Sequence, residues 1–134
     1  MTDQPTTPSK ALNITLWILQ ALLAAFMIMA AVMKFMPIEK MAPKMHWMGE
    51  APGIVVRLLG LIDLAGGLGL ILPGLLRIKP RLTAWAAMGI VALMISAMIF
   101  HVSRGEAPVI GVNIFALLIA AFIAWGRFKK VPLG

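Results

Sequence analysis

The chain has 134 residues and a net charge of +7, with 61% hydrophobic and 13% charged residues and a mean hydropathy of +0.96. Soluble domains are about 45–50% apolar and about 25% charged, and a soluble core of this size could not bury so much apolar surface. The chain has no cysteine, which excludes thiol nucleophiles, iron–sulfur clusters and thiolate zinc sites. These figures predict a small polytopic membrane protein.

Four apolar runs follow one another along the chain. A helix needs about 20 residues to cross a bilayer core of about 30 Å, and these runs lack the alternation of barrel strands. The sequence therefore predicts an all-α membrane protein, a four-transmembrane-helix bundle with spans at about 11–35, 54–76, 82–101 and 107–126. A single membrane domain is expected over 11–128, after a flexible polar tail at 1–10 and before a basic tail at 129–134.

The charges between the spans predict the orientation. Both termini and the middle loop share one side, which carries seven Lys and Arg residues against one acid, whereas the other side carries five against three. By the positive-inside rule, both termini should be cytoplasmic. Trp17, Trp85 and Trp125 fall at the expected cytoplasmic interface, where indole rings settle. Because the basic residues flank apolar spans and no nucleic-acid motif is visible, binding to nucleic acid is not expected.

Six polar residues are expected in the outer half of the bundle, and no comparable set is apparent in the inner half. An acid within a span costs about 2.5–3.5 kcal/mol, so Asp63 should face the interior and find a partner among Lys34, Arg57 and His101. The pair is either a structural ion pair or a proton or ligand site. The candidates for ligand binding or proton handling are Lys34, Arg57, Asp63, His101, Arg104 and Asn113.

The sequence also predicts roles or contacts for single polar residues. His101 is either a proton carrier or an interfacial side chain bonded to a carbonyl. With two histidines and no cysteine, no metal site is expected. Asn113 should bond to Asp63 or to a backbone carbonyl. Helix–helix contacts of the same kind are expected for Thr15, Gln20 and Ser96.

The glycines near Asp63 and the loop between the first two spans give two further expectations. The glycines around Asp63 either let helices pack closely or form a ligand-facing notch, and Pro73 with Gly74 should end the second span. The loop over 37–53 has methionines at helical spacing and a break at Pro43, which suits an amphipathic piece on the outer leaflet. It either forms a lid over the polar cluster through His46 and Trp47 or anchors the loop to the surface.

The order of these features, from about residue 16 to residue 127, resembles the DoxX-like family of small four-helix membrane proteins. The second span contains Arg57-x-x-Gly60-x-x-Asp63, which resembles a family run that commonly carries an acidic residue. The other matching pieces are Met33-Lys34-Phe35, Phe100-His101 followed by Arg104, Asn113, and Ala124-Trp125-Gly126-Arg127.

The resemblance implies a protein of a bacterial inner membrane. The family takes its name from membrane subunits associated with thiosulfate:quinone oxidoreduction. We expect an accessory or binding subunit that holds a quinone or lipid-like ligand, or a partner complex, at the polar cluster. The alternatives are a membrane subunit of an oxidoreductase, of thiosulfate/quinone or oxidative-stress type, that uses an external redox partner, and a small transporter. An autonomous enzyme with an intrinsic cofactor is not expected. The expected partners are membrane lipids, a membrane or redox protein, and further copies of the chain.

Overall fold

The computed structural model describes residues 10–41, 43, 49, 52–79, 81–105 and 110–130. Its long helices are α1 (Lys10–Phe35), α4 (Gly53–Leu76), α5 (Leu82–Ser103) and α6 (Gly111–Trp125), which the π-helical turn η2 (Gly126–Lys130) continues. The short helix α2 (Ile38–Met41) follows α1. In the described part of the chain, four helices are long and apolar enough to cross a membrane. They confirm the predicted all-α membrane fold.

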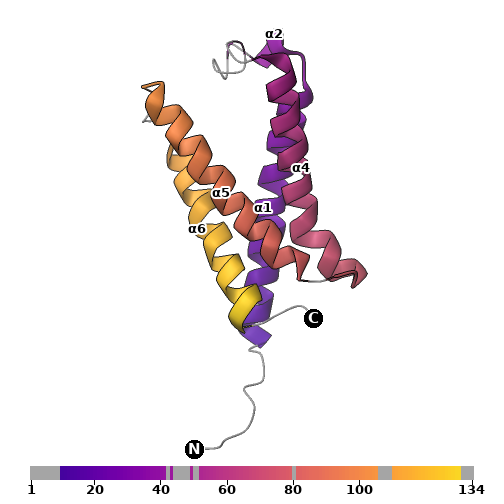
Figure 1. Ribbon diagram of the computed structural model, residues 1–134. Helices are drawn as coiled ribbons and strands as arrows, with labels where there is room; N and C mark the ends of the chain where they lie inside the picture. The colour runs from indigo at the N-terminus through magenta and orange to yellow at the C-terminus, as the bar shows by residue number, and fades with distance from the viewer. Residues whose placement is uncertain are drawn as a thin grey trace, which may run out of the picture.

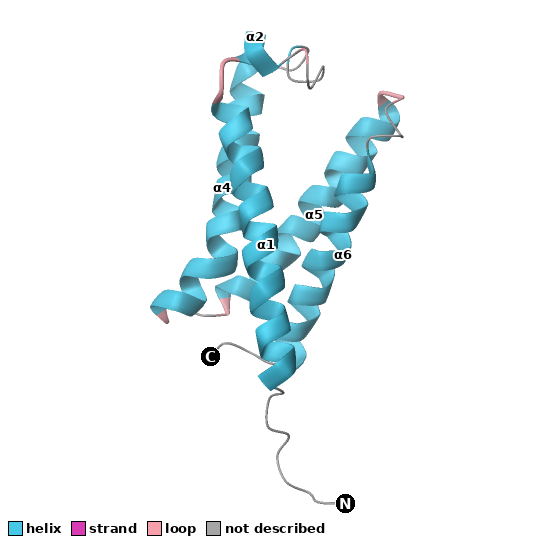
Figure 2. Ribbon diagram, turned by 180° about the vertical axis from the view of Figure 1, so that it is seen from behind, coloured by secondary structure: helices cyan, strands magenta, loops and turns pink. Residues whose placement is uncertain are grey.

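The four long helices form two antiparallel pairs, a first pair of α1 with α4 and a second pair of α5 with α6 (Figure 1). The pairs lie close together at the end where α1 begins and η2 ends, which we name the proximal end. They diverge toward the distal end, where α1 and α5 end, and the reverse view in Figure 2 shows the same divergence. Assignment of the proximal end to the cytoplasm stays a prediction from the charges.

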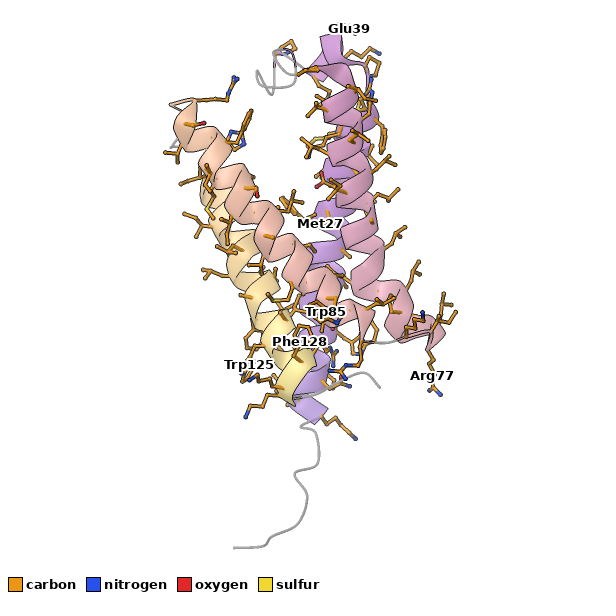
Figure 3. The ribbon with its side chains drawn as sticks, viewed as in Figure 1. Met27, Glu39, Arg77, Trp85, Trp125 and Phe128 are labelled. Carbon is orange, nitrogen blue, oxygen red and sulfur yellow. The ribbon has the colours of Figure 1, made fainter. Side chains whose placement is uncertain are left out.

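The shared core lies where the pairs meet, toward the proximal end. On α1 the buried residues recur every three or four positions, which gives the helix one inward stripe. That stripe meets small and apolar residues of the other helices, and Met27, near the level where the pairs separate, is fully buried (Figure 3). The largest buried apolar side chains are Leu16, Met27, Val56, Leu70, Ile90 and Ile123.

The glycines of α4 serve two different interfaces. A Cβ built on Gly67 would lie 3.1 Å from the carbonyl oxygen of Ala24 on α1. A Cβ on Gly69 would lie 2.9 Å from the Cβ of Ala86 on α5. Because small residues let helix backbones approach closely in a membrane, these contacts confirm the close-packing role expected for this run.

We expect Gly67→Ala to destabilise the fold by about 1–3 kcal/mol, since the added methyl group would press on α1 and overpack the first pair. Gly89→Ala is the matched control, because a Cβ at Gly89 has no atom within 4 Å. Alanine favours a helix over glycine by about 0.5–1 kcal/mol, so this control should be neutral or stabilising. Thermal unfolding in detergent measures both, and equal effects would contradict the packing assignment.

Helix α4 ends at Leu76, the residue at which the second span was expected to end, and the Pro73 carbonyl accepts bonds from the N–H groups of Arg77 and Ile78. Proline is tolerated in such helices when neighbouring groups satisfy the backbone. The helix–helix contacts expected for Thr15 and Ser96 are wrong. The hydroxyls of Thr15 and Ser96 donate to carbonyls one turn back in their own helices, rather than to another helix. A hydroxyl that faces lipid is satisfied most simply in this way.

Candidate functional site

Lys34 on α1 and Asp63 on α4 form an ion pair within the first pair of helices. Lys34 Nζ donates to Asp63 Oδ2 over 2.5 Å, and the side chain of Asp63 is only 5% exposed. Asp63 therefore faces the bundle interior, as its cost in lipid predicts. Of the three candidate partners named from the sequence, the structure pairs Asp63 with Lys34.

Arg57 binds the end of α1 rather than Asp63. Its Nη1 donates to the carbonyl oxygen of Lys34 and, over 2.8 Å, to that of Met36. Carbonyls in the last turn of a helix have no partner within that helix, and a guanidinium there also complements the helix dipole. Arg57 thus satisfies backbone groups that lipid could not.

The motif Arg57-x-x-Gly60-x-x-Asp63 contacts Lys34 along its whole length. Arg57 holds the Lys34 carbonyl and Asp63 holds its ammonium group. Between them, a Cβ on Gly60 would lie 3.1 Å from the Cβ of Lys34. The lysine is therefore bound at its backbone and at its side-chain end, with glycine leaving room for the stem. This arrangement favours the structural ion pair over a proton or ligand site.

The other predicted residues lie on the second pair of helices. His101 and Arg104 are at the distal end of α5, where the Arg104 guanidinium lies 5.3 Å from the centroid of the Phe100 ring. The His101 ring meets the same phenyl group edge-on, at 5.4 Å between centroids. The structure thus splits the six candidates into Lys34, Arg57 and Asp63 on one pair and His101, Arg104 and Asn113 on the other.

Asn113 lies in the first turn of α6 and does not bond to Asp63. Its Nδ2 donates to Met94 Sδ over 3.6 Å, which links α6 to α5. The expected bond to Asp63 or to a backbone carbonyl is wrong, because the aspartate is on the first pair, which diverges from the second at this level. The proposed lid residues His46 and Trp47 lie outside the described residues.

A second polar network lies at the proximal end, where the sequence suggested no comparable set. Arg127 is 3% exposed and donates from Nε to Gln20 Oε1 over 2.6 Å and from Nη1 to Asn13 Oδ1 over 2.8 Å. Gln20, fully buried, donates in turn to the carbonyl oxygen of Leu70 over 2.7 Å. This network joins η2, α1 and α4, so it ties the two pairs together.

Arg127 was missed because the fourth span was expected to end at residue 126. Its position continues the buried stripe of α6, in which Ala116, Ala120 and Ile123 are spaced by four and three residues and Arg127 follows four later. Asn13 and Gln20 are seven apart on α1, two turns along one face. These polar residues occur at the same helical spacing as the buried apolar residues of their helices. That spacing is the sequence signal from which the network could have been predicted.

Aromatic rings and basic side chains meet at the proximal end. The Arg127 guanidinium lies 5.5 Å from the Trp17 ring centroid, and Lys130 Nζ lies 5.8 Å from that of Trp125. Trp85 packs edge-on against Phe128 at 5.2 Å, and Figure 3 shows both with Trp125 at this end. Indoles beside basic residues are typical of a membrane interface.

Two apolar grooves lie along the seams between the pairs. The α4/α5 groove has a volume of about 290 Å³ and is lined by Ile62, Ala65, Gly66, Ala86, Gly89, Ile90 and Leu93. The α1/α6 groove has a volume of about 340 Å³ and is lined by Leu19, Leu22, Leu23, Phe26, Val112, Phe115, Ala116 and Ile119. Such linings suit hydrocarbon, as in an acyl chain or the isoprenoid tail of a quinone.

The described residues place no group of three His, Cys, Asp or Glu side chains where it could hold a metal ion.

A family model described as the DoxX-like family matches residues 18–123. No curated protein and no solved structure matches the chain. The family match includes Lys34, Arg57 and Asp63, and its range also contains both grooves, whereas Asn13 and Arg127 lie beyond its two ends. With most of its length matched, the chain belongs to the DoxX-like family of membrane proteins.

Proposed function

We propose that this protein is a binding subunit of a bacterial inner membrane, with both termini in the cytoplasm, which holds a lipid-like molecule such as a quinone between its two helix pairs. The observation that supports the proposal is the α4/α5 groove, a recess in the seam that joins the pairs. The oxidoreductase-subunit and transporter alternatives stay predictions from the sequence.

Small residues maintain this groove. Gly and Ala make up four of its seven lining residues. Gly66 is used for packing, since a Cβ there would lie 3.3 Å from Ile90 Cγ1, but a Cβ on Gly89 would meet nothing within 4 Å. Lipid tails are as apolar as the side chains themselves, so a lipid-facing helix gains nothing from a recess. A recess that glycine keeps open is better explained by a molecule that fits it.

Helix α5 extends beyond the groove toward the distal end, where it carries polar residues. Leu93, at the distal limit of the groove on α5, is eleven residues before Arg104. At the helical rise this is about 16 Å, close to half of the bilayer core of about 30 Å. A molecule with its tail in the groove therefore reaches the level of His101 and Arg104 with its polar head. We assign these two residues to the head group and Lys34, Arg57 and Asp63 to the scaffold.

Filling the groove tests the proposal. Gly89→Leu places an isobutyl group in the α4/α5 groove without a clash, so the fold should survive while the bound molecule is lost. Gly111→Leu is the matched control, because Gly111 also has open space around it but lines neither groove.

Each variant would be purified with its native lipids, and the bound small molecules would be identified by mass spectrometry. We expect a quinone or lipid-like molecule at about one per chain with the unmodified protein and with Gly111→Leu, and a large loss with Gly89→Leu. Equal retention by both variants would contradict the site. The proposal would be overturned by finding no such molecule on the unmodified protein.

A further inference from the structure

The proximal end carries basic residues at the start of α1, in the turn between α4 and α5, and in η2. In the described ranges these residues are Lys10, Arg77, Lys79, Arg81, Arg127, Lys129 and Lys130. The acids of the same ranges are Glu39, which Figure 3 shows at the distal end, and Asp63, which bonds to Lys34. The described part of the chain thus supplies no carboxylate for the proximal charges.

Three of the basic residues lie close together in the turn that joins α4 to α5. Arg77, Lys79 and Arg81 occupy alternate positions there, and all three are exposed. Figure 3 shows the side chain of Arg77 extending away from the helices at the proximal end. We name these three residues the basic turn. Because like charges repel one another over such short distances, an anion bound among them would stabilise the turn.

The backbone of the basic turn is strained at two of its charged residues. Arg77 has φ 54° and Lys79 has φ 45°, in the left-handed region that glycine adopts freely and other L residues adopt only at a cost. Glycine at either position would relieve this strain and remove a charge. The presence of Arg and Lys there is therefore better explained by a use for their charges than by the stability of the turn.

The start of α5 also favours an anion at this turn. Arg81 is the N-cap residue of α5 and makes no side-chain hydrogen bond to the first turn of the helix. That position is usually taken by Ser, Thr, Asp or Asn, whose oxygen accepts such a bond. The positive end of the helix dipole is there as well, so Arg81 adds a charge of the same sign. A negatively charged group from outside would offset both.

The apolar residues of the turn indicate which kind of anion fits. Leu76, Ile78 and Leu82 alternate with the basic residues and are exposed. Trp85, about one helical turn along α5, is 62% exposed, as is usual for an indole at a membrane interface. A soluble anion would leave these apolar side chains uncovered. A phospholipid instead brings acyl chains to them and a phosphate to the cations.

We infer that the basic turn binds the head group of an anionic phospholipid in the membrane leaflet at the proximal end. The phosphate accepts charge-assisted hydrogen bonds from the guanidinium and ammonium groups, and basic segments beside spans recognise anionic head groups in this way. The inference does not rest on the proposed function, whose head-group residues His101 and Arg104 lie at the distal end.

Native mass spectrometry of the whole protein in detergent tests the inference with two probes, dioleoyl-phosphatidylglycerol and dioleoyl-phosphatidylcholine. The two lipids have the same acyl chains and differ in net charge. Each basic residue beside an anionic surface contributes about fivefold in affinity, so we expect phosphatidylglycerol to bind on the order of a hundredfold more tightly. This preference should fall as salt is added. Equal affinity for the two lipids would overturn the inference.

A pair of triple variants tests the assignment to the turn. The first neutralises the basic turn through Arg77→Asn, Lys79→Asn and Arg81→Gln, since asparagine tolerates the left-handed conformation. Its control removes the same charge from three other exposed residues at the proximal end, through Lys10→Gln, Lys129→Gln and Lys130→Gln. We expect the first variant to lose most of the preference for phosphatidylglycerol and the control to keep most of it. Equal losses would assign the preference to net charge and overturn the role of the turn.

The single substitution Arg77→Gly separates lipid binding from stability. It relieves the left-handed strain and removes one charge, so the melting temperature in lipid-free detergent should rise. The affinity for phosphatidylglycerol should fall about fivefold. A turn that served the fold alone would show the rise in melting temperature with no change in lipid affinity, and that result would contradict the inference.

Discussion

Replacing Asp63 with leucine is expected to lower the free energy of unfolding by about 3–5 kcal/mol, the largest effect we anticipate for a single substitution. The reason is that Lys34 would remain in the first helix pair with its side chain only 16% exposed and its bond to Asp63 removed. Breaking a buried pair from one side leaves an uncompensated charge, which costs more than the pair itself contributes. Thermal or detergent-induced unfolding of the purified protein measures the loss.

The double variant Lys34→Met with Asp63→Leu is the control. It removes both charges and keeps apolar side chains of similar length, and replacing a buried pair in this way is often neutral. We therefore expect most of the stability to return. If the double variant is as unstable as Asp63→Leu alone, the loss does not come from Lys34 losing its bond to Asp63, and the pairing account is wrong. A normal fold in Asp63→Leu itself would contradict it more directly.

Replacing Arg127 with methionine is expected to cost about 2–3 kcal/mol. The change keeps a long stem but removes the donors to Gln20 and Asn13, and Gln20 Oε1 would be left in a fully buried side chain without this bond. A buried acceptor that loses its partner costs about 1–3 kcal/mol. Arg127→Lys should restore only part of the stability, because one ammonium group does not reproduce the planar fork that reaches both acceptors.

Lys129→Met is the matched control for Arg127→Met, since Lys129 belongs to the same turn and is exposed. A surface change of this kind usually stays within about 0.5 kcal/mol. Unfolding of both variants under the same conditions separates the loss of the network from the loss of a positive charge at the membrane surface. Equal destabilisation by the two substitutions would show that charge, rather than the buried network, is what the fold requires.

These expectations divide the polar residues by role. Lys34, Arg57 and Asp63 satisfy one another and the end of α1, so their loss should first be seen in stability. The tail of the proposed ligand instead contacts uncharged residues, in the α4/α5 groove lined by glycine, alanine and larger apolar side chains. A substitution at Gly89 should therefore change binding and not stability, the reverse of a substitution at Asp63.

The positions of the four helices could be predicted from the sequence, because a run of about 20 apolar residues has one favourable arrangement in a bilayer. The inward direction of Asp63 could also be predicted, since a carboxylate facing lipid is too costly. Its choice of Lys34 over His101 depended on which helices pair, and hydropathy carries no information on that.

The class of protein, the spans and the need for Asp63 to find a partner inside the bundle all follow from the order of the amino acids. The tertiary structure alone decided that the spans form two diverging pairs, which separates Asn113 from Asp63 and opens two grooves. It also decided that Arg127, one residue past the predicted end of the fourth span, is buried against Gln20. The physical reason is that span formation depends on transfer of each segment into lipid, whereas helix pairing depends on contacts between segments far apart in the chain.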